Sequence, residues 1–316
     1  MTWLVTGGAG YIGAHVTAAL VAAGEPVAVL DDLSTGDARR VPDGVPFLLG
    51  DAGDPATIRD VLRRHRVTGV MHLAGSKSVP ESFERPRWYH RQNVTVVETL
   101  LDAMAEAAVT RLVFSSSAAV YGLPVHGVPG PAGVGEDAPA RPLNPYGRSK
   151  LAAEHAVASS PGVSWIALRY FNAVGAAAAH LADRGTANLL PRVLHAARTG
   201  EPFTVTGTGL PTADGTAIRD YVHVADIAAA HLAAAAAVTC DRRARIYNAG
   251  TGAGHSVLDV IGAVERVTGA PVPWTAGPPR PGDPAAVVAD VTRIGAELGW
   301  RAGHTLDDAV RSAWTP

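Results

Sequence analysis

The sequence predicts an α/β protein built on a doubly wound parallel sheet, with a smaller mixed α/β lobe in the C-terminal part. Three observations support this. Short apolar runs alternate with helix-like segments in the first half, a glycine-rich turn joins the first run to the first helix, and Gly-, Pro- and Ala-rich loops dominate after about residue 170. Alternation of strands and helices at this spacing is typical of a parallel sheet covered on both faces.

The strands and helices of the first half can be placed individually. The five predicted strands are short, rich in Val and Leu and not alternating, as expected of strands buried on both faces: residues 3–6, 26–30, 46–49, 69–72 and 111–114. Helices are expected at residues 11–23, 54–65 and 87–107. Asp54 and Pro55 form a typical N-cap followed by proline in the first helical turn.

The expected division of the chain is a dinucleotide-binding domain over residues 1–172 and a substrate domain over residues 173–316. A small-residue loop is predicted at 173–186, and segments near 220–250 are expected to return to the first domain. A crevice between two lobes is a usual location for a small-molecule site.

Composition excludes several classes of protein. The 316 residues are 47% apolar and 18% charged, which does not fit a disordered chain, and the net charge of −2 offers no basic surface for nucleic acid. The longest apolar stretch, 227–238, is shorter than the ~18–20 residues of a membrane span. One cysteine (Cys240) and no metal-ligand spacing among the twelve histidines exclude a disulfide framework and a metal site. With no signal peptide evident, we expect a cytoplasmic protein.

The glycine-rich turn resembles a dinucleotide cradle. Gly7, Gly10 and Gly13 would let the backbone come close to a pyrophosphate at the N-terminus of a helix. Asp31 ends the second predicted strand, where its carboxylate can accept hydrogen bonds from the hydroxyls of the adenine ribose. A glycine turn needs no ligand, however, and Asp31 can also be read as a turn residue. Asp31 and Asp32 together would repel a 2′-phosphate, which favours NAD over NADP.

Tyr146 and Lys150 are four residues apart, on one face of a predicted helix. A free phenol has a pKa of ~10, and bringing it near 7 takes about 4 kcal/mol. A unit charge ~5 Å away supplies roughly 3 kcal/mol at an effective dielectric constant of ~20, so Lys150 and an oxidised nicotinamide together suffice. The alternative is an amphipathic pair with Lys150 in solvent.

Three serines, 115–117, end the fifth predicted strand, where parallel sheets bind ligands. The Ser117 hydroxyl is suited to bond a substrate hydroxyl and relay its proton to Tyr146. Alternatively, the serines satisfy backbone groups at a strand exit.

The order of these motifs resembles the extended short-chain dehydrogenase/reductases, and most closely the UDP-glucose (UDP-galactose) 4-epimerases. The resemblance covers nearly the whole chain through blocks at residues 72–77, 114–122, 144–150, 169–172, 188–191, 214–224 and 280–283. It implies a Rossmann-type fold, a tightly held NAD, a UDP-sugar substrate, and C4 epimerisation through a transient 4-keto sugar. It also implies a homodimer through helices near residues 87–107 and 146–159.

The resemblance assigns further roles residue by residue. It implies cofactor-lining positions at Tyr11, Ile12, Asp51, Ala52, Lys77 and Phe171, and nucleotide-side positions at Asn172, Asn188, Arg219, Tyr221, Arg280 and Asp283. Other interpretations remain open: Arg219 can pair with Asp220 or Asp226, Asn172 can cap a turn, and Asp283 can be a turn residue.

Alternatives of related and unrelated function also exist. A 4,6-dehydratase needs an acid pair after the strand-five hydroxyl, where this chain has Ala118 and Ala119. The same alanines, with Asn172, argue against a UDP-glucuronate 4-epimerase. A non-enzymatic NAD sensor would not need the set Ser117, Tyr146 and Lys150.

Val287 occupies the position that resembles the family's pocket gate. A tyrosine there goes with plain hexoses, whereas a small residue leaves room for a 2-N-acetyl group. We therefore expect activity on UDP-GlcNAc and UDP-GalNAc as well as on UDP-glucose and UDP-galactose. The short, alanine-rich loop at 173–187 departs from the family pattern.

Overall fold

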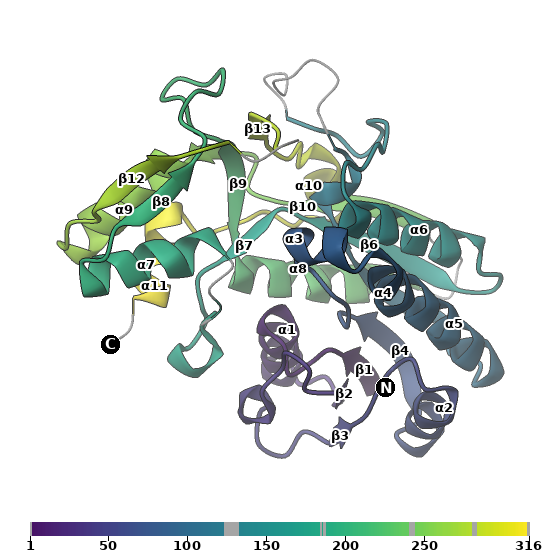
Figure 1. The fold of residues 1–316 in the computed structure, drawn as a ribbon. Coiled ribbons are helices and arrows are strands. Elements are labelled where there is room, and N and C mark those ends of the chain that lie inside the picture. The colour runs from purple at the N-terminus through teal and green to yellow at the C-terminus, as the bar shows by residue number, and fades with distance from the viewer. Residues whose placement is uncertain are drawn as a thin grey trace.

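The computed structural model describes residues 2–122, 133–183, 185, 188–239, 244–279 and 283–314. Figure 1 shows a large parallel sheet with its helices at one end of the molecule and a smaller group of strands and helices at the other. Arg280, which was predicted on the nucleotide side, and Cys240, the single cysteine of the sequence, lie outside the described residues.

The large sheet has seven strands in the order β10-β6-β5-β4-β1-β2-β3, and every neighbouring pair is parallel. The strands are β1 (Thr2–Thr6), β2 (Val27–Asp31), β3 (Phe47–Leu49), β4 (Val67–His72), β5 (Arg111–Ser117), β6 (Ser164–Tyr170) and β10 (Ala244–Ala249). The order reverses between β1 and β4, and ligands of such sheets bind outside the carboxyl ends at this switch point.

Helices cover both faces of this sheet, because the strands are apolar on both sides. One core packs residues of α2 (Pro55–Arg64), α5 (Val96–Glu106) and α6 (Pro145–Ser159) against the sheet. The other packs α1 (Tyr11–Ala22), α8 (Val224–Ala237) and α10 (Thr292–Leu298) against the opposite face. The predicted doubly wound α/β class is confirmed.

The predicted helix at 87–107 is confirmed, since consecutive residues from 86 to 106 are helical, with a π-helical turn in the middle. The chain forms α3 (Val79–Glu84) and α4 (Pro86–His90), and then a π-helical turn (Arg91–Thr95) leads into α5. Proline at residue 86 starts α4 afresh, since proline suits a first helical turn. The π turn contains Asn93, whose side chain bonds the backbone of Ser76 rather than solvent.

The remaining strands form two small sheets. In the mixed sheet, β9 (Ile218–His223) pairs with β7 (Asn172–Val174), β11 (Gly254–Ser256) and β13 (Ala286–Val287). In the other, β8 (Phe203–Thr206) pairs with β12 (Trp274–Gly277). The helices α7 (Leu189–Thr199), α9 (Val257–Thr268) and α11 (Leu306–Ala313) pack around a third core.

The predicted loop at 173–186 begins with strand structure instead, since β7 pairs with β9 and a short 3₁₀ turn follows at Ala179–Leu181. Two elements from the range 220–250 lie with the large sheet: α8 packs against α1, and β10 pairs with β6 over six residues. No helix in the described ranges is long and apolar enough to cross a membrane.

Candidate active site

The turn between β1 and α1 is built for a close backbone approach. A Cβ added at Gly13 would lie 2.0 Å from the Gly7 carbonyl oxygen, and Gly7 itself has φ of +72° with Ala74 packed behind it. Gly10 caps α1 without a side-chain hydrogen bond. The first amides of the helix therefore have no side-chain cap from Gly10, and uncapped N–H groups at a helix N-terminus are the groups that bind phosphate.

Asp31 lies at the carboxyl end of β2, beside this turn, and is 7% exposed. Its two carboxylate oxygens accept bonds from the backbone N–H of Ala9 and of Leu33, both at 2.9 Å. Burial raises the pKa of Asp31, while these backbone bonds act in the opposite direction. Asp31 is thus a fixed acceptor at the edge of the cradle, and the glycine turn and carboxylate together fit a dinucleotide.

The other predicted cofactor positions surround the same edge of the sheet. Asp51 follows β3 and accepts from the backbone of Gly53, and Ala52 beside it is buried. The exposed Lys77 places its ammonium 5.8 Å from the ring centroid of Tyr11. The remaining two are Ile12, in the first turn of α1, and Phe171, buried directly after β6.

Tyr146 and Lys150 lie in the first part of α6, which Asn144 caps through a 2.7 Å bond to the amide of Gly147. Ser117, the last residue of β5, lies beside the half-buried phenol of Tyr146, and its hydroxyl acts to lower the pKa of that phenol. Lys150 is buried and donates from Nζ to the Ser115 carbonyl oxygen at 3.0 Å. The alternative in which Lys150 is solvated is therefore wrong.

The electrostatics of this trio are unusual. Burial raises the pKa of Tyr146, and the Ser117 bond offsets part of that shift. Burial lowers the pKa of Lys150 to about 8, with the Glu154 carboxylate acting in the opposite direction. A phenol whose pKa is raised by burial needs a nearby positive charge before it can act as a base. Titratable groups with pKa values as perturbed as those of Tyr146 and Lys150 are typical of functional sites.

Asn93 also belongs to this region, although its local sequence carries no signal. Its amide donates to Ser76 O and to Ser149 Oγ, both at 2.9 Å, so it ties the π turn to α6. A Cβ added at Gly75 would lie 2.7 Å from Asn93 Oδ1 and 3.6 Å from Lys150 Nζ. Only the π-helical turn, which periodicity does not reveal, brings Asn93 to this position.

On the nucleotide side, ligand-type groups are paired with each other. The Arg219 guanidinium forms an ion pair with Asp283, and neither of the alternative partners Asp220 and Asp226 is used. The Asn188 amide donates to Asp183 at 2.6 Å. The first pair joins two residues predicted separately for one site, whereas Asp183 was not predicted.

Three further predicted positions lie near this pair. The Tyr221 side chain is buried in β9, opposite Asn172 of β7 in the strand register. Val287 of β13 lies opposite Arg219 and packs against the small apolar cluster that includes Phe171. The predicted pocket gate and a predicted cofactor-lining position therefore share one cluster.

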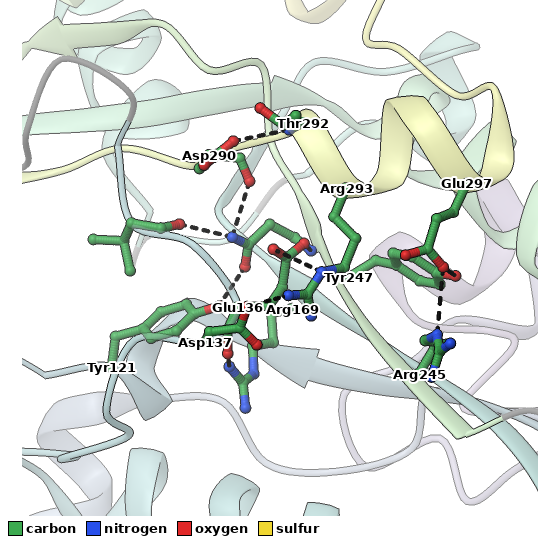
Figure 2. A network of polar contacts seen from close by, with 12 residues as sticks. Tyr121, Glu136, Asp137, Arg169, Arg245, Tyr247, Asp290, Thr292, Arg293 and Glu297 are labelled. Atoms are coloured by element: carbon green, nitrogen blue, oxygen red, sulfur yellow. Dashed lines mark hydrogen bonds and ion pairs between the residues drawn. The ribbon is translucent and has the colours of Figure 1, made fainter.

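A network of hydrogen bonds and ion pairs lies beside this apolar cluster (Figure 2). Asn248 at the end of β10 accepts a 2.6 Å bond from the Tyr121 hydroxyl and donates to Val134 O at 2.8 Å. The backbone N–H of Asn248 donates to Glu136. Residue 134 in turn bridges Ala289, two positions beyond Val287. The segment before α6 is thus held against the strand that carries the gate.

No group of three or more His, Cys, Asp or Glu side chains in the described part of the chain is arranged to hold a metal ion. His72, His223 and His231 are buried. The site therefore consists of a glycine cradle, a fixed acid, a Ser–Tyr–Lys trio and a paired nucleotide side.

This fold and site define a dinucleotide-binding α/β protein with a tyrosine–lysine pair at the carboxyl end of its sheet. The chain belongs to the NAD dependent epimerase/dehydratase family, whose model matches residues 3–250. The predicted family is confirmed.

Individual relatives are similar over nearly the full length. The UDP-glucose 4-epimerase of Azospirillum brasilense is 45% identical over 98% of this chain and 90% of its own. The structure of the Stenotrophomonas maltophila UDP-glucose-4-epimerase, with bound NAD and formylated UDP-arabinopyranose, has a TM-score of 0.93 at 40% identity, covering 99% and 97% of the two chains. The Bifidobacterium longum enzyme in complex with NAD+ and UDP has a TM-score of 0.90 at 37% identity, with the same coverage.

Proposed function

We propose that this protein catalyses the reversible C4 epimerisation of a UDP-hexose with a bound NAD. The observation that carries the proposal is the trio at the carboxyl end of β5, where the Ser117 hydroxyl acts on the pKa of Tyr146 and Lys150, one helical turn further along α6, is anchored to the Ser115 carbonyl. The glycine cradle beside it and the relatives named UDP-glucose 4-epimerases support the same assignment.

NAD would be held at its pyrophosphate by the turn at Gly7, Gly10 and Gly13 and at its adenine ribose by Asp31. The cradle that a Cβ would fill and the buried, doubly bonded carboxylate both fit this group. When bound, NAD supplies the carbon that takes the sugar C4 hydrogen as hydride and returns it.

Tyr146 would accept the proton of the sugar 4-hydroxyl, with Ser117 as the bridging hydroxyl. Burial works against the phenolate, so Tyr146 acts as a base only with compensating positive charge nearby. Lys150, one turn away and directed by the Ser115 carbonyl, supplies part of that charge. The same phenol then returns the proton to the 4-oxygen.

Epimerisation also requires that the sugar ring turn over before hydrogen returns to C4. This favours tight binding of UDP and few hydrogen bonds to the hexose. Arg219, Asp283 and Arg280 are suited to the nucleotide, since guanidinium groups bind phosphate oxygens in a planar fork. Ala118 and Ala119, directly after Ser117, offer the sugar no side-chain bond and no acid pair for dehydration.

The finer substrate range follows from Val287. We propose that its small side chain admits a 2-N-acetyl group, so that UDP-GlcNAc and UDP-GalNAc are substrates alongside UDP-glucose and UDP-galactose. The alternative, a UDP-glucuronate 4-epimerase, would need a cation or hydroxyls for the sugar carboxylate, and Ala118 and Ala119 do not provide them. We further propose a cytoplasmic homodimer that contacts through α5 and α6, independent of membranes and nucleic acid.

The decisive experiment incubates purified protein with a panel of UDP-hexoses, without added NAD, and separates the C4 epimers. We expect interconversion with no net change in reduced-cofactor absorbance and no loss of C4 deuterium to solvent. A stable 4-keto product would indicate a dehydratase, and no turnover at all would indicate a sensor.

Tyr146→Phe is expected to lower turnover by about 10²–10⁴-fold while UDP binding is retained, because it removes the proton acceptor. The matched control is Tyr247→Phe, which removes a phenol that bonds Glu297 on the far side of β10 and should leave turnover unchanged. Equal rates for Tyr146→Phe and the unmodified protein would eliminate the assignment of Tyr146.

A further inference from the structure

A buried carboxylate lies one helical turn beyond Lys150 and has no role in the chemistry described so far. Glu154 is 3% exposed. Its Oε1 accepts from Arg169 Nε at 2.9 Å and from the Ser116 hydroxyl at 2.5 Å, and its Oε2 accepts from Arg169 Nη2 at 2.6 Å. These three bonds come from two partners, and the forked contact with the Arg169 guanidinium is the geometry of an arginine–carboxylate ion pair.

These bonds join α6 to the strand that carries the site serines. Lys150 donates to the Ser115 carbonyl, and the hydroxyl of the next residue, Ser116, donates to Glu154. Arg169 fixes the other side of the carboxylate from β6, and its guanidinium stacks 4.7 Å from the ring centroid of Tyr121. Two consecutive residues of β5, Ser115 and Ser116, thus hold Lys150 and Glu154 of α6 in place.

Stability alone is a weak reason for such an arrangement. Desolvating two charges costs several kcal/mol per ion, and buried pairs can often be replaced by apolar residues without loss of stability. The pair lies next to a lysine whose charge burial disfavours, and Glu154 favours that charge. The Glu154 carboxylate therefore acts on two buried cations, Arg169, with which it is paired, and Lys150, one helical turn away.

The other titratable groups around Lys150 do not supply this charge. His72 reaches it from β4, but burial lowers the pKa of His72 to about 3, so this ring is neutral near pH 7. Tyr146 lies one turn before Lys150, and Tyr170 of β6 faces Tyr146. Burial raises the pKa of both phenols, so neither is anionic by default.

We propose that Glu154 is a positioning residue for the reaction: its carboxylate, held by Arg169 and Ser116, keeps the Lys150 ammonium charged and aligned beside Tyr146. The inference rests on the proposed function, since Lys150 matters through Tyr146. It makes Glu154 part of the machinery although it contacts neither the cofactor nor the sugar.

The chain allows a direct test, because Lys77 and Lys150 are its only lysines. Protein grown with ¹³C-lysine gives two side-chain signals in a carbon NMR spectrum, and Lys77→Arg identifies the one from Lys150. Titration of that signal reads the Lys150 midpoint without substrate or turnover. In Glu154→Gln, which keeps the shape but loses the charge, we expect the midpoint to fall by about one to two pH units.

Two further variants separate charge from packing. Arg169→Lys keeps the Glu154 carboxylate paired but loses the forked contact, so it should lower the melting temperature without moving the Lys150 midpoint. If Glu154→Gln does not fold, Glu154→Gln/Arg169→Gln removes both charges together, and the midpoint should fall by less, because the loss of the Arg169 cation offsets part of the loss of the Glu154 charge. An unchanged midpoint in the folded variant that lacks Glu154 overturns the proposal.

Activity provides the second readout. Where epimerisation is measurable, Glu154→Gln should move the alkaline limb of the kcat profile to lower pH and leave KM for the UDP-sugar unchanged. A drop in kcat at all pH values with an unshifted profile would indicate a merely structural role and overturn the proposal. Failure of the wild-type protein to epimerise would refute the proposed function, while the NMR midpoint would still report on Glu154.

Discussion

The cofactor side and the nucleotide-sugar side of the site are organised differently. On the cofactor side, the glycine turn and Asp31 are fixed by the backbone of β1, β2 and α1, and the acceptor atoms already occupy set positions. On the nucleotide side, Arg219 and Asn188 are occupied by Asp283 and Asp183. If the proposed assignments hold, the first side needs little rearrangement to bind its ligand, whereas the second exchanges internal bonds for ligand bonds.

The difference suits a protein that keeps one ligand and turns over the other. A preorganised site loses little conformational freedom on binding, so its ligand is held tightly. Where an arginine is already paired with a carboxylate, a phosphate ligand must replace that carboxylate. The binding free energy is then only the difference between the two interactions, so the ligand is released more easily. Substitutions on the two sides should therefore have unequal effects.

The largest effect is expected for Gly13→Ala. The new Cβ would lie 2.0 Å from a backbone oxygen, so the turn must move and the cradle is lost. We expect NAD retention to fall by about 100-fold or more, measured as cofactor content of the purified protein. Gly262→Ala is the control, because a Cβ there meets nothing within 4 Å and helix propensity favours alanine by about 1 kcal/mol. Full retention in Gly13→Ala would show that the cradle is not preorganised.

A smaller loss is expected for Asp31→Asn. An amide can accept only through its oxygen, so one of the bonds from Ala9 and Leu33 is lost at a cost of about 1–3 kcal/mol. NAD affinity should fall about 10–100-fold by calorimetry. The exposed neighbour Asp32, changed to Asn, should have little effect. Equal effects at both positions would argue that Asp31 does not contact the cofactor.

The third prediction tests the exchange of partners. Arg219→Gln should weaken UDP binding by about 10-fold, and Asp283→Asn by less, because only the arginine is suited to phosphate. A double-mutant cycle in thermal unfolding should give a coupling of about 0.5–1 kcal/mol without UDP, since the pair is partly exposed. With saturating UDP we expect the coupling to shrink. Unchanged coupling would mean that the pair stays intact when UDP binds.

The smallest effect concerns the gate. Val287→Tyr should lower kcat/KM for UDP-GlcNAc by about 10-fold through steric exclusion and leave UDP-glucose nearly unaffected. Val287→Ala, which preserves the space, is the control. Parallel loss on both substrates would indicate damage to the cluster with Phe171 rather than a change in specificity.

The sequence predicted what depends on local pattern. The apolar strands, the glycine turn after β1 and the i, i+4 spacing of Tyr146 and Lys150 all follow from periodicity or short motifs. It could not predict contacts between distant elements. The pairing of Arg219 with Asp283 spans 64 residues, and the π turn at Asn93 looks like ordinary helix in sequence. Likewise, β7 forms in a loop-like, alanine-rich segment because β9 offers it a partner.

The place of β10 in the large sheet has a consequence for synthesis of the protein. β10 pairs with the outer edge of β6, but the ribosome makes it only after β7, β8, β9 and α8. At roughly 5–20 residues per second, the open edge persists on the ribosome for on the order of ten seconds. A fragment ending after β6 would keep this edge permanently and invite association between chains. The nucleotide-binding half is therefore not a module that can be cut out and expressed alone.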